Sequence, residues 1–388
     1  MPKKILFLTG TRADFGKLKP LIAEVAGDED FEYRIFATGT HMLSRFGSTV
    51  IEIEKAGFKN VFSYINQEGS LSTGMDLALA NTIHGLGLYI REFPPDLIVV
   101  HGDRIEALAG ATVGALRNVL VAHVEGGEVS GTVDELLRHS ISKLSHIHFV
   151  ANDEARTRLI QMGELPESVY VTGSPDVDVM LSGNLPNLTE VKEKYEIPFS
   201  RYHIFAYHPV TTELDTLREK IQVVTGALVK SGLNFVVIHP NNDSGADLIL
   251  ECIEPLQHNP NFRVLRSMRF EYFLALLKGT ETIIGNSSAG IREAPVYGIP
   301  TINIGSRQMN RHQCESIVNV PEDSRMILEN LRNPPGRTRP SLHFGNGKSA
   351  KIFIKELRSP SLWRVSRQKQ FRDLKVPALL ADSLYASA

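Results

Sequence analysis

The sequence predicts an α/β protein with two doubly wound domains and a cleft between them. Short apolar runs, each long enough for one buried strand, alternate with longer amphipathic stretches along the chain. The alternation begins again after residue 200, and a largely polar stretch with glycine and proline, Ser182–Thr189, separates the two series. The length of 388 residues fits roughly two to three domains.

The individual elements follow from these patterns in chain order. The first series predicts strands at Ile5–Thr9, Tyr33–Thr38, Leu97–His101, Leu120–Val124, His148–Ala151 and Val169–Thr172, with helices at Gly74–Glu92, Ile105–Arg117 and Asp134–Leu144. The second series predicts strands at His203–Tyr207, Phe235–His239, Phe262–Leu265, Thr282–Ile284 and Thr301–Ile304, with helices at Leu214–Lys230, Asp247–Leu256, Phe270–Leu277 and Ser288–Tyr297. We therefore expect an N-terminal domain over residues 1–182 and a C-terminal domain over 183–360. The segment 361–388 is too short and polar for a domain, so we expect it to pack on the body or to fray.

Composition excludes several classes of protein. Lys and Arg number 42 and Asp and Glu 44, a net charge of −2, which gives no electrostatic basis for binding nucleic acid or an anionic membrane. Two cysteines, Cys252 and Cys314, are too few for a disulfide framework or a cysteine zinc cluster, and they favour a reducing, intracellular compartment. The apolar run that begins at Ile5 ends after four residues, so we expect a buried strand there and no secretion signal. No run reaches the roughly 18 apolar residues that a membrane helix needs.

Polar side chains follow the predicted strands at six places. In such sheets ligands bind beyond the carboxyl ends of the strands. Six ends that carry His, Asp, Glu, Arg, Asn and Ser therefore predict a ligand site rather than ordinary loops. They are Thr9–Arg12, His101–Arg104, His123–Gly127, His208-Pro209, His239–Asn242 and Gly285–Ser288.

The segment Gly285–Ser288 is a candidate phosphate site. A strand, a tight turn and a helix start would offer free backbone N–H groups and serine hydroxyls to an anion. The alternative is a plain capped helix, since Asn and Ser are common capping residues. Arg12 and Arg307 also follow strand runs directly and could bind a diphosphate in a bidentate manner, so we favour phosphate. No dinucleotide or P-loop glycine motif occurs, which argues against nicotinamide chemistry and ATP hydrolysis.

Three acids form the candidate catalytic set: Asp103, Glu125 and Asp134. Carboxylates that converge on one cleft shift each other's pKa values, as acid–base chemistry requires, but a structural ion-pair network would do the same. Thr132 and Glu135 also fit a helix capping box. Among the 13 histidines, His208 at a strand end is the best candidate for proton transfer. His146 and His148 share one side of a strand, but no third ligand at a supporting spacing favours a metal.

These motifs, in this order, resemble the hydrolysing UDP-N-acetylglucosamine 2-epimerases of sialic acid synthesis. The resemblance runs from Ile5 to about residue 320 and extends weakly to Trp363–Ser366, which is similar to the C-terminal segment of the meningococcal-type enzymes. Non-hydrolysing relatives typically have Ala-Gly-Leu-Arg-Thr where this chain has Gly126–Ser130, which favours the hydrolysing branch. The resemblance implies two Rossmann-like domains of the glycosyltransferase-B type, no metal or other cofactor, and a cytoplasmic homodimer or dimer of dimers.

The resemblance also implies a reaction and a set of residues. UDP-N-acetylglucosamine and water would give N-acetylmannosamine and UDP, with Asp103, Glu125, Asp134 and His208 as catalytic residues. The substrate's UDP part would be bound by Arg12, Gly16, Arg104, His208, Asn241, Met268, Ser287, Ser288, Glu293 and Arg307. Three alternatives remain: a retaining glycosyltransferase on the same fold, a nucleotide-sugar sensor without turnover, and a hydrolysing epimerase for a UDP-diacetamido-trideoxyhexose.

Overall fold

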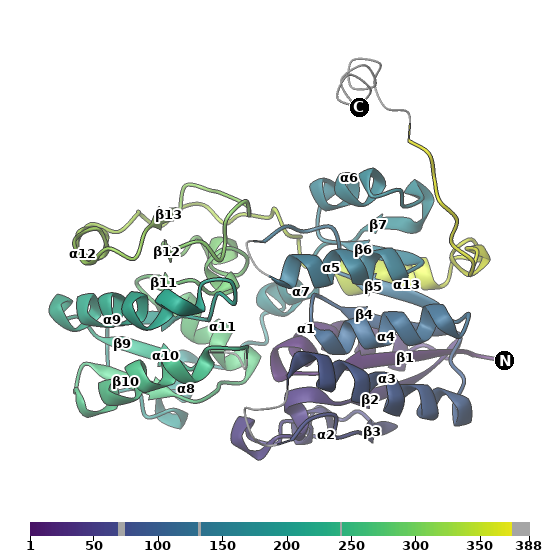
Figure 1. Ribbon diagram of the computed structural model, residues 1–388, viewed down its shortest axis with the longest axis horizontal. Helices are drawn as coiled ribbons and strands as arrows, with labels where there is room; N and C mark the ends of the chain where they lie inside the picture. Colours follow the sequence, from purple (N-terminus) through teal and green to yellow (C-terminus); the bar gives the residue numbers. More distant parts are fainter. Residues whose placement is uncertain (69–73, 131–132, 241–242, 375–388) are drawn as a thin grey trace.

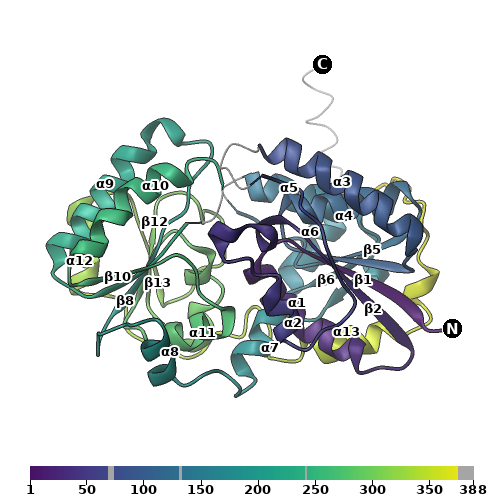
Figure 2. The ribbon, with the colours of Figure 1, turned by 90° about the horizontal axis from the view of Figure 1, so that it is seen from below.

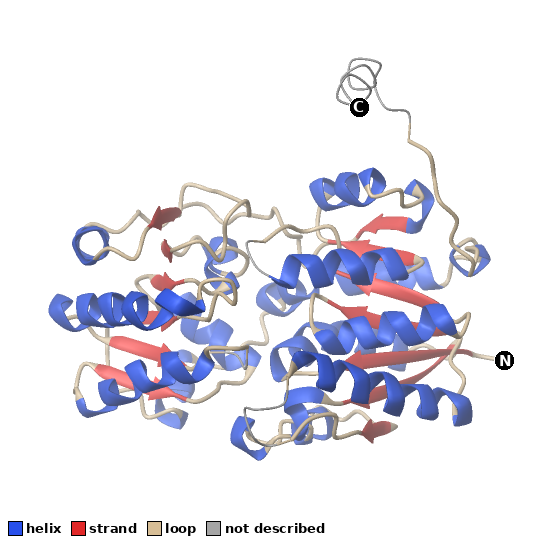
Figure 3. Cartoon of the chain, in the orientation of Figure 1, coloured by secondary structure: helices blue, strands red, loops and turns tan. Residues whose placement is uncertain are grey.

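The protein consists of two α/β halves that lie side by side (Figure 1). The computed structural model describes residues 1–388 apart from 69–73, 131–132, 241–242 and 375–388. Layers of helices cover both faces of each sheet (Figure 3). Among the described residues, no helix is long and apolar enough to cross a membrane.

The first half is built on a parallel sheet of seven strands. The strands are β1 (Lys3–Thr9), β2 (Phe31–Ala37), β3 (Val61–Ser63), β4 (Leu97–His101), β5 (Leu120–Val124), β6 (Ile147–Val150) and β7 (Val169–Val171). They lie in the order β3-β2-β1-β4-β5-β6-β7. The helices are α1 (Arg12–Ala26), α2 (Ile51–Lys55), α3 (Met75–Glu92), α4 (Ile105–Leu116), α5 (Val133–Leu144), α6 (Asp153–Gln161) and α7 (Pro175–Leu181), with 3-10 turns at η1 (Gly39–Met42), η2 (Ser44–Phe46) and η3 (Pro166–Ser168).

The second half repeats this plan with six parallel strands. The strands are β8 (His203–Ala206), β9 (Phe235–Ile238), β10 (Phe262–Leu265), β11 (Ile283–Gly285), β12 (Thr301–Ile304) and β13 (Ile317–Val320), in the order β10-β9-β8-β11-β12-β13. The remaining helices are α8 (Leu188–Lys194), α9 (Leu214–Ser231), α10 (Ala246–Ile253), α11 (Phe270–Gly279), α12 (Ser324–Arg332) and α13 (Ser349–Leu357), with 3-10 turns at η4 (Glu254–His258), η5 (Ser288–Gly290), η6 (Ala294–Tyr297) and η7 (Leu362–Arg364). The predicted fold class of two doubly wound domains is confirmed.

Alternate residues of each strand face opposite helix layers, so each sheet has two cores. In the first half Phe7 packs towards α1, whereas Leu8 packs towards α3 and α4. In the second half Phe205 packs with the layer of α9, α10 and α12, and Ile204 with that of α8 and α11. The central strands β4, β5, β8 and β12 are therefore buried along their whole length, which explains their near-continuous apolar sequences.

Helix α13 crosses back to the first half. It lies inside the range expected for the second domain, yet Phe353 packs against Phe7 and Phe149 in the core of the first sheet. In Figure 2 the yellow C-terminal part lies with the purple and blue elements of the first half. The chain thus passes between the halves twice, first before α8 and again before α13.

One predicted element has a different form. The helix predicted at Ser288–Tyr297 consists of two short 3-10 turns, η5 and η6, because Pro295 has no N–H to continue a helical hydrogen-bond pattern. The helix dipole expected at Ser288 is therefore absent, and an anion there would rely on hydroxyl groups and local N–H groups.

Candidate active site

A cavity of about 360 Å³ lies between the two sheets and is lined by both halves. Most of the predicted site residues line it: Asp103, Arg104, Glu125, Asp134, His208, Met268, Ser287, Ser288, Glu293 and Arg307. The first three acids come from the first half, and the serines and Arg307 come from the second. Acid groups and anion-binding groups thus face one space.

Strand register explains why His101 and Glu125 are neighbours. His101 ends β4 and pairs with Val124 of β5, so the next residue, Glu125, leaves the sheet beside the imidazole. Glu125 has a φ of 66°, the left-handed region that L-residues rarely adopt, and its amide donates to the Phe149 carbonyl at 2.9 Å. An uncommon backbone conformation at a buried carboxylate marks a site where the fold fixes a side-chain direction against local preference.

Asp14, His101 and Glu125 form a chain of charged groups. His101 Nδ1 lies 2.9 Å from Asp14 Oδ1, and its Nε2 lies 3.2 Å from Glu125 Oε2. Burial alone would lower the pKa of His101, but the two carboxylates together raise it to about 9. The imidazole is therefore charged at neutral pH and favours ionised Glu125.

Lys17 adds a second cation to this region. Its Nζ lies 3.1 Å from Asp176 Oδ2, 3.6 Å from Glu293 Oε1 and 3.8 Å from Glu125 Oε2. Burial would raise the pKa of Glu125, but Arg292, Lys17 and His101 hold it well below its ordinary value. The pKa of Glu293 is raised, by burial first and then by the nearby Asp176 and Glu125, although Lys17 opposes the change. The same cluster thus lowers the pKa of Glu125 and raises the pKa of Glu293, so Glu293 takes up a proton more readily.

Asp103 is paired within the first half. Its Oδ2 accepts a hydrogen bond from Arg138 Nη2, and Arg138 comes from α5. Burial would raise the pKa of Asp103, but Arg138 and Arg311 hold it well below its usual range. Asp103 is therefore ionised at neutral pH and can accept a proton or stabilise positive charge on a substrate.

Asp134 connects the halves. It lies in the first turn of α5, and its Oδ2 accepts from Arg307 Nη2 of the second half at 3.2 Å. The predicted capping partner Thr132 lies outside the described residues, and Glu135 accepts from the backbone of Ser130 at 2.5 Å. The side chain of Asp134 therefore faces the cavity with an arginine from the opposite wall.

The second half fixes its polar groups through Asn286. Gly285 pairs with Ala206, which places Asn286 beside His208. Asn286 Oδ1 accepts from the amide of His208 at 2.6 Å, and its Nδ2 donates to the His208 carbonyl at 2.9 Å. The Ser287 hydroxyl accepts from the Ala289 amide at 3.3 Å. The predicted phosphate segment is thus a rigid turn beside His208.

Two predicted residues of the described part of the chain lie away from this cavity, and a third cannot be placed. Arg12 and Gly16 line a separate space of about 20 Å³, where Arg12 donates to Ser267 at 3.2 Å. Gly16 faces Phe270 of α11, and a Cβ atom there would lie 2.8 Å from Phe270 Cβ. Asn241 lies outside the described residues.

Sequence reasoning missed several charged residues of the site: Lys17, Arg138, Asp176, Arg292 and Arg311. Asp176 and Arg292 stand far apart in the chain, and only the fold brings them together. His146 and His148 do not share a ligand position, because His148 pairs with Glu164 at 3.1 Å and His146 accepts from the amide of Val121 at 3.1 Å. Within the described ranges no group of three or more His, Cys, Asp or Glu is arranged to hold a metal ion.

Comparison with known proteins gives a consistent result. The family model described as UDP-N-acetylglucosamine 2-epimerase matches residues 23–358. A UDP-N-acetylglucosamine 2-epimerase of Neisseria meningitidis serogroup B is 46% identical, over 96% of this chain and 100% of the relative. A hydrolysing UDP-N,N'-diacetylbacillosamine 2-epimerase of Legionella pneumophila is 33% identical, over 90% of this chain and 94% of the relative. A crystal structure of a Neisseria meningitidis UDP-GlcNAc 2-epimerase bound to UDP-GlcNAc has a TM-score of 0.76 at 19% identity, over 91% of this chain and 99% of that one, and supports the fold.

Proposed function

The chain belongs to the UDP-N-acetylglucosamine 2-epimerase family, and on that premise we propose that it is the hydrolysing enzyme which converts UDP-N-acetylglucosamine and water into N-acetylmannosamine and UDP. One observation carries the proposal. Acids of the first half (Asp103, Glu125, Asp134) and anion-binding groups of the second (Ser287, Ser288, Arg307) line the same cavity.

The chemistry requires the C1–O bond to UDP to weaken before the C2 proton leaves. The C2 hydrogen is not acidic in the ground state, but it becomes so as positive charge develops at C1. Loss of UDP and of the C2 proton gives a glycal. Water then adds at C1 while a proton returns to C2 from the opposite face, so UDP-sugar plus water becomes N-acetylmannosamine plus UDP. The reaction therefore needs groups for proton transfer on two faces and a site that stabilises the leaving diphosphate.

The candidate residues divide between these tasks. Asp103 and Glu125 are ionised at neutral pH because arginine, lysine and imidazolium groups surround them, so they begin the cycle as proton acceptors and stabilise charge at C1. Asp134 and His208 complete the acid–base set. Arg104, Ser287, Ser288 and Arg307 would bind the diphosphate, Glu293 the ribose, and the backbone near Met268 the uracil. Arg12, Gly16 and Asn241 stay in the proposed UDP set on the strength of the family resemblance.

A labelled-water experiment tests the proposal. The purified protein is incubated with UDP-N-acetylglucosamine in D2O, and free UDP and the C2 position of the sugar are followed by NMR. We expect N-acetylmannosamine with one deuterium at C2 and an equal amount of UDP. Transfer of sugar only when an acceptor is added would indicate a glycosyltransferase, and UDP binding without product would indicate a sensor.

Variants assign the activity to the site. Asp103→Asn and Glu125→Gln should each lower kcat by about 10²–10⁴-fold while UDP binding is largely retained. Asp215→Asn, at an exposed position of α9, is the matched control and should turn over like the wild type. Near-full turnover by both site variants would contradict the assignment.

A second substrate is favoured by one finding, the 33% identity to the diacetylbacillosamine epimerase. The higher identity to the Neisseria relative supports UDP-N-acetylglucosamine as the first choice. Competition between the two UDP-sugars, measured as the ratio of kcat/KM values, decides between them.

The proposal also includes the role and assembly of the protein. We place the activity at the start of sialic acid synthesis, in the cytoplasm, in a homodimer or dimer of dimers. The family resemblance supports these points. Size-exclusion chromatography with light scattering at several protein concentrations tests the oligomeric state.

A further inference from the structure

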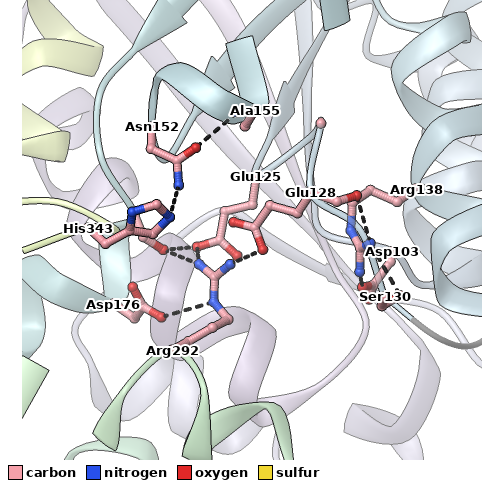
Figure 4. Close-up of polar contacts among 12 residues, drawn as sticks. Asp103, Glu125, Glu128, Ser130, Arg138, Asn152, Ala155, Asp176, Arg292 and His343 are labelled. Carbon is pink, nitrogen blue, oxygen red and sulfur yellow. Dashed lines mark hydrogen bonds and ion pairs between the residues drawn. The ribbon is translucent and has the colours of Figure 1, made fainter. Parts of the chain in front are cut away.

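Arg292 reaches from the second half into the first. It lies between η5 and η6, after β11, and is only 4% exposed. Its guanidinium points towards Glu125, Glu128 and Asp176 (Figure 4). All three carboxylates belong to the loops or helix starts of the first half, so this side chain contacts elements on the opposite wall of the cavity.

The close contacts are made by the two terminal nitrogens of the guanidinium. Nη2 lies 2.7 Å from Glu125 Oε1, Nη1 pairs with Glu128 Oε2, and Nε lies 3.9 Å from Asp176 Oδ2. Nη2 also donates to the Ser174 hydroxyl at 2.6 Å, and that hydroxyl donates to Glu125 Oε1. One face of the guanidinium lies over the Phe344 ring, 4.7 Å from its centroid.

We propose that Arg292 is a positioning residue for the reaction: it orients the Glu125 carboxylate and keeps it charged when the two halves meet. The inference rests on the proposed function, since it concerns the carboxylate assigned there to proton transfer. Arg292 acts through Glu125 and takes no part in the bond changes itself.

Charge balance around Glu125 supports this role. Glu125, Glu128, Asp176 and Glu293 are buried together, with Lys17, His101 and Arg292 as the neighbouring cations. A buried carboxylate without its cation either takes up a proton or turns towards another partner. Arg292 is the largest attractive influence that lowers the pKa of Glu125, and burial opposes it. Removal of Arg292 should therefore raise that pKa and loosen the carboxylate.

The experiment compares four variants of the full chain. Arg292→Met removes the charge, Arg292→Lys keeps a charge without the planar fork, and Ser174→Ala removes the hydroxyl that links Arg292 to Glu125. Arg201→Met is the matched control, because Arg201 belongs to the same half and forms an exposed pair with Glu281 at 3.0 Å. For each protein, kcat and KM are measured from pH 5 to 9, with UDP affinity by calorimetry and thermal unfolding.

The expected results separate positioning from a structural role. Arg292→Met should lower kcat by about 10²-fold with little change in KM, because a small misplacement of a reacting group costs that much. An acidic limb of kcat against pH should appear in this variant or lie at higher pH than in the wild type, since a raised Glu125 pKa leaves the base protonated at pH values where it is ionised in the wild type. Arg292→Lys should retain the wild-type acidic limb with a smaller loss of kcat, and Ser174→Ala should lose about tenfold. Arg201→Met should match the wild type.

Other outcomes overturn the inference. If Arg292→Met shows lower thermal stability but an unchanged kcat and acidic limb, Arg292 serves only to join the halves. If Arg292→Met does not fold, the Lys and Ala variants decide, and unaltered kcat in both contradicts positioning. A wild-type protein that binds UDP but forms no product would instead refute the proposed function.

Discussion

At the scale of single residues, each candidate acid forms an ion pair with a cation from a distant part of the chain. Glu125 contacts Lys17 of α1, His101 of β4 and Arg292 of the second half. These contacts decide its charge, and no local pattern around Glu125 could predict them. The sequence predicted that Asp103, Glu125 and Asp134 share one cleft, because Asp103 and Glu125 follow parallel strands, which end at one edge of the sheet, and Asp134 opens the next helix.

His101 should make stability depend on pH in a defined direction. Its pKa in the folded protein, about 9, lies above the ordinary value of 6.5. Its contribution is therefore fully present below pH 6.5 and is lost as pH rises through 9, a difference worth roughly 3 kcal/mol. We expect the free energy of unfolding of wild type minus that of His101→Gln, from urea titration, to shrink between pH 6 and 9.5. His84→Gln, at an exposed position of α3, should show no such trend. A difference between wild type and His101→Gln that grows with pH would contradict a charged His101.

Gly285 should tolerate no side chain. Its φ is 126°, and a Cβ atom would lie 2.0 Å from the carbonyl oxygen of Ala206 on the adjacent strand. Gly285→Ala should therefore lower the free energy of unfolding by more than about 3 kcal/mol or prevent folding. The control is Gly226→Ala inside α9, where an added Cβ atom would meet nothing within 4 Å apart from its own stretch of helix backbone, and it should stabilise the protein by up to about 1 kcal/mol. Equal behaviour of the two variants would argue against the strand pairing at Gly285.

At the scale of elements, strands with a continuous apolar sequence were predicted well, and two of the four edge strands were not. Leu97–His101, Leu120–Val124 and Thr301–Ile304 agree with the predicted bounds, since a strand buried on both faces is a continuous apolar run. The edge strand Phe262–Leu265, which is partly buried, also agrees. The edge strands β3 and β13 were missed. Two of the three residues of β3 are exposed, and only Val320 of β13 is buried, so neither has a clear apolar signal.

The C-terminal segment packs on the first half rather than fraying over its described part. Lys369 Nζ donates to the carbonyls of Lys143 at 2.9 Å and Ser145 at 2.6 Å, at the end of α5, and pairs with Glu164 at 2.5 Å. Arg372 donates to the Glu164 carbonyl at 2.9 Å. A cation at a helix C-terminus satisfies carbonyl groups that have no partner within the helix.

Lys369 should therefore stabilise α5 measurably. We expect Lys369→Met to lower the free energy of unfolding by about 1–3 kcal/mol, because the buried Glu164 and the helix carbonyls lose a partly buried cation. Lys351→Met is the control, since Lys351 is 76% exposed in its pair with Glu24. Thermal or urea unfolding provides the measurement, and equal stability of the two variants would show that the segment only rests on the surface.

At the scale of the whole molecule, the two halves meet through close packing and ion pairs. Lys19 of α1 pairs with Glu271 of α11 at 2.7 Å, and Arg269 pairs with Glu52 of α2 at 2.9 Å. Gly16 allows α1 to approach Phe270 between these pairs. The sequence predicted a cleft between two domains, but it could not predict which helices touch across it, because those contacts depend on the relative placement of the halves.

Gly16→Val should act as a wedge between the halves. A Cβ at residue 16 would lie 2.8 Å from Phe270 Cβ, which cannot move without α11. We expect a larger radius of gyration by small-angle scattering and weaker UDP binding, by roughly tenfold, because groups from both halves must reach one ligand. The same substitution at Gly87 of α3, where an added Cβ atom would meet nothing within 4 Å apart from its own stretch of helix backbone, should change neither quantity. Wild-type affinity in Gly16→Val would mean that the α1–α11 contact is not needed for binding.

The return of α13 to the first core has a mechanical consequence. Two segments of the chain, near residues 182–187 and 337–348, connect the halves. Phe353, which follows the second segment, packs beside Phe7 in the first half. Two bodies joined at two points cannot tumble independently, and their easiest relative motion is rotation about the line through both joints. A ligand that contacts both halves then has to stop only this one rotation. The conformational entropy lost on binding is therefore smaller than it would be for two halves joined by a single flexible linker.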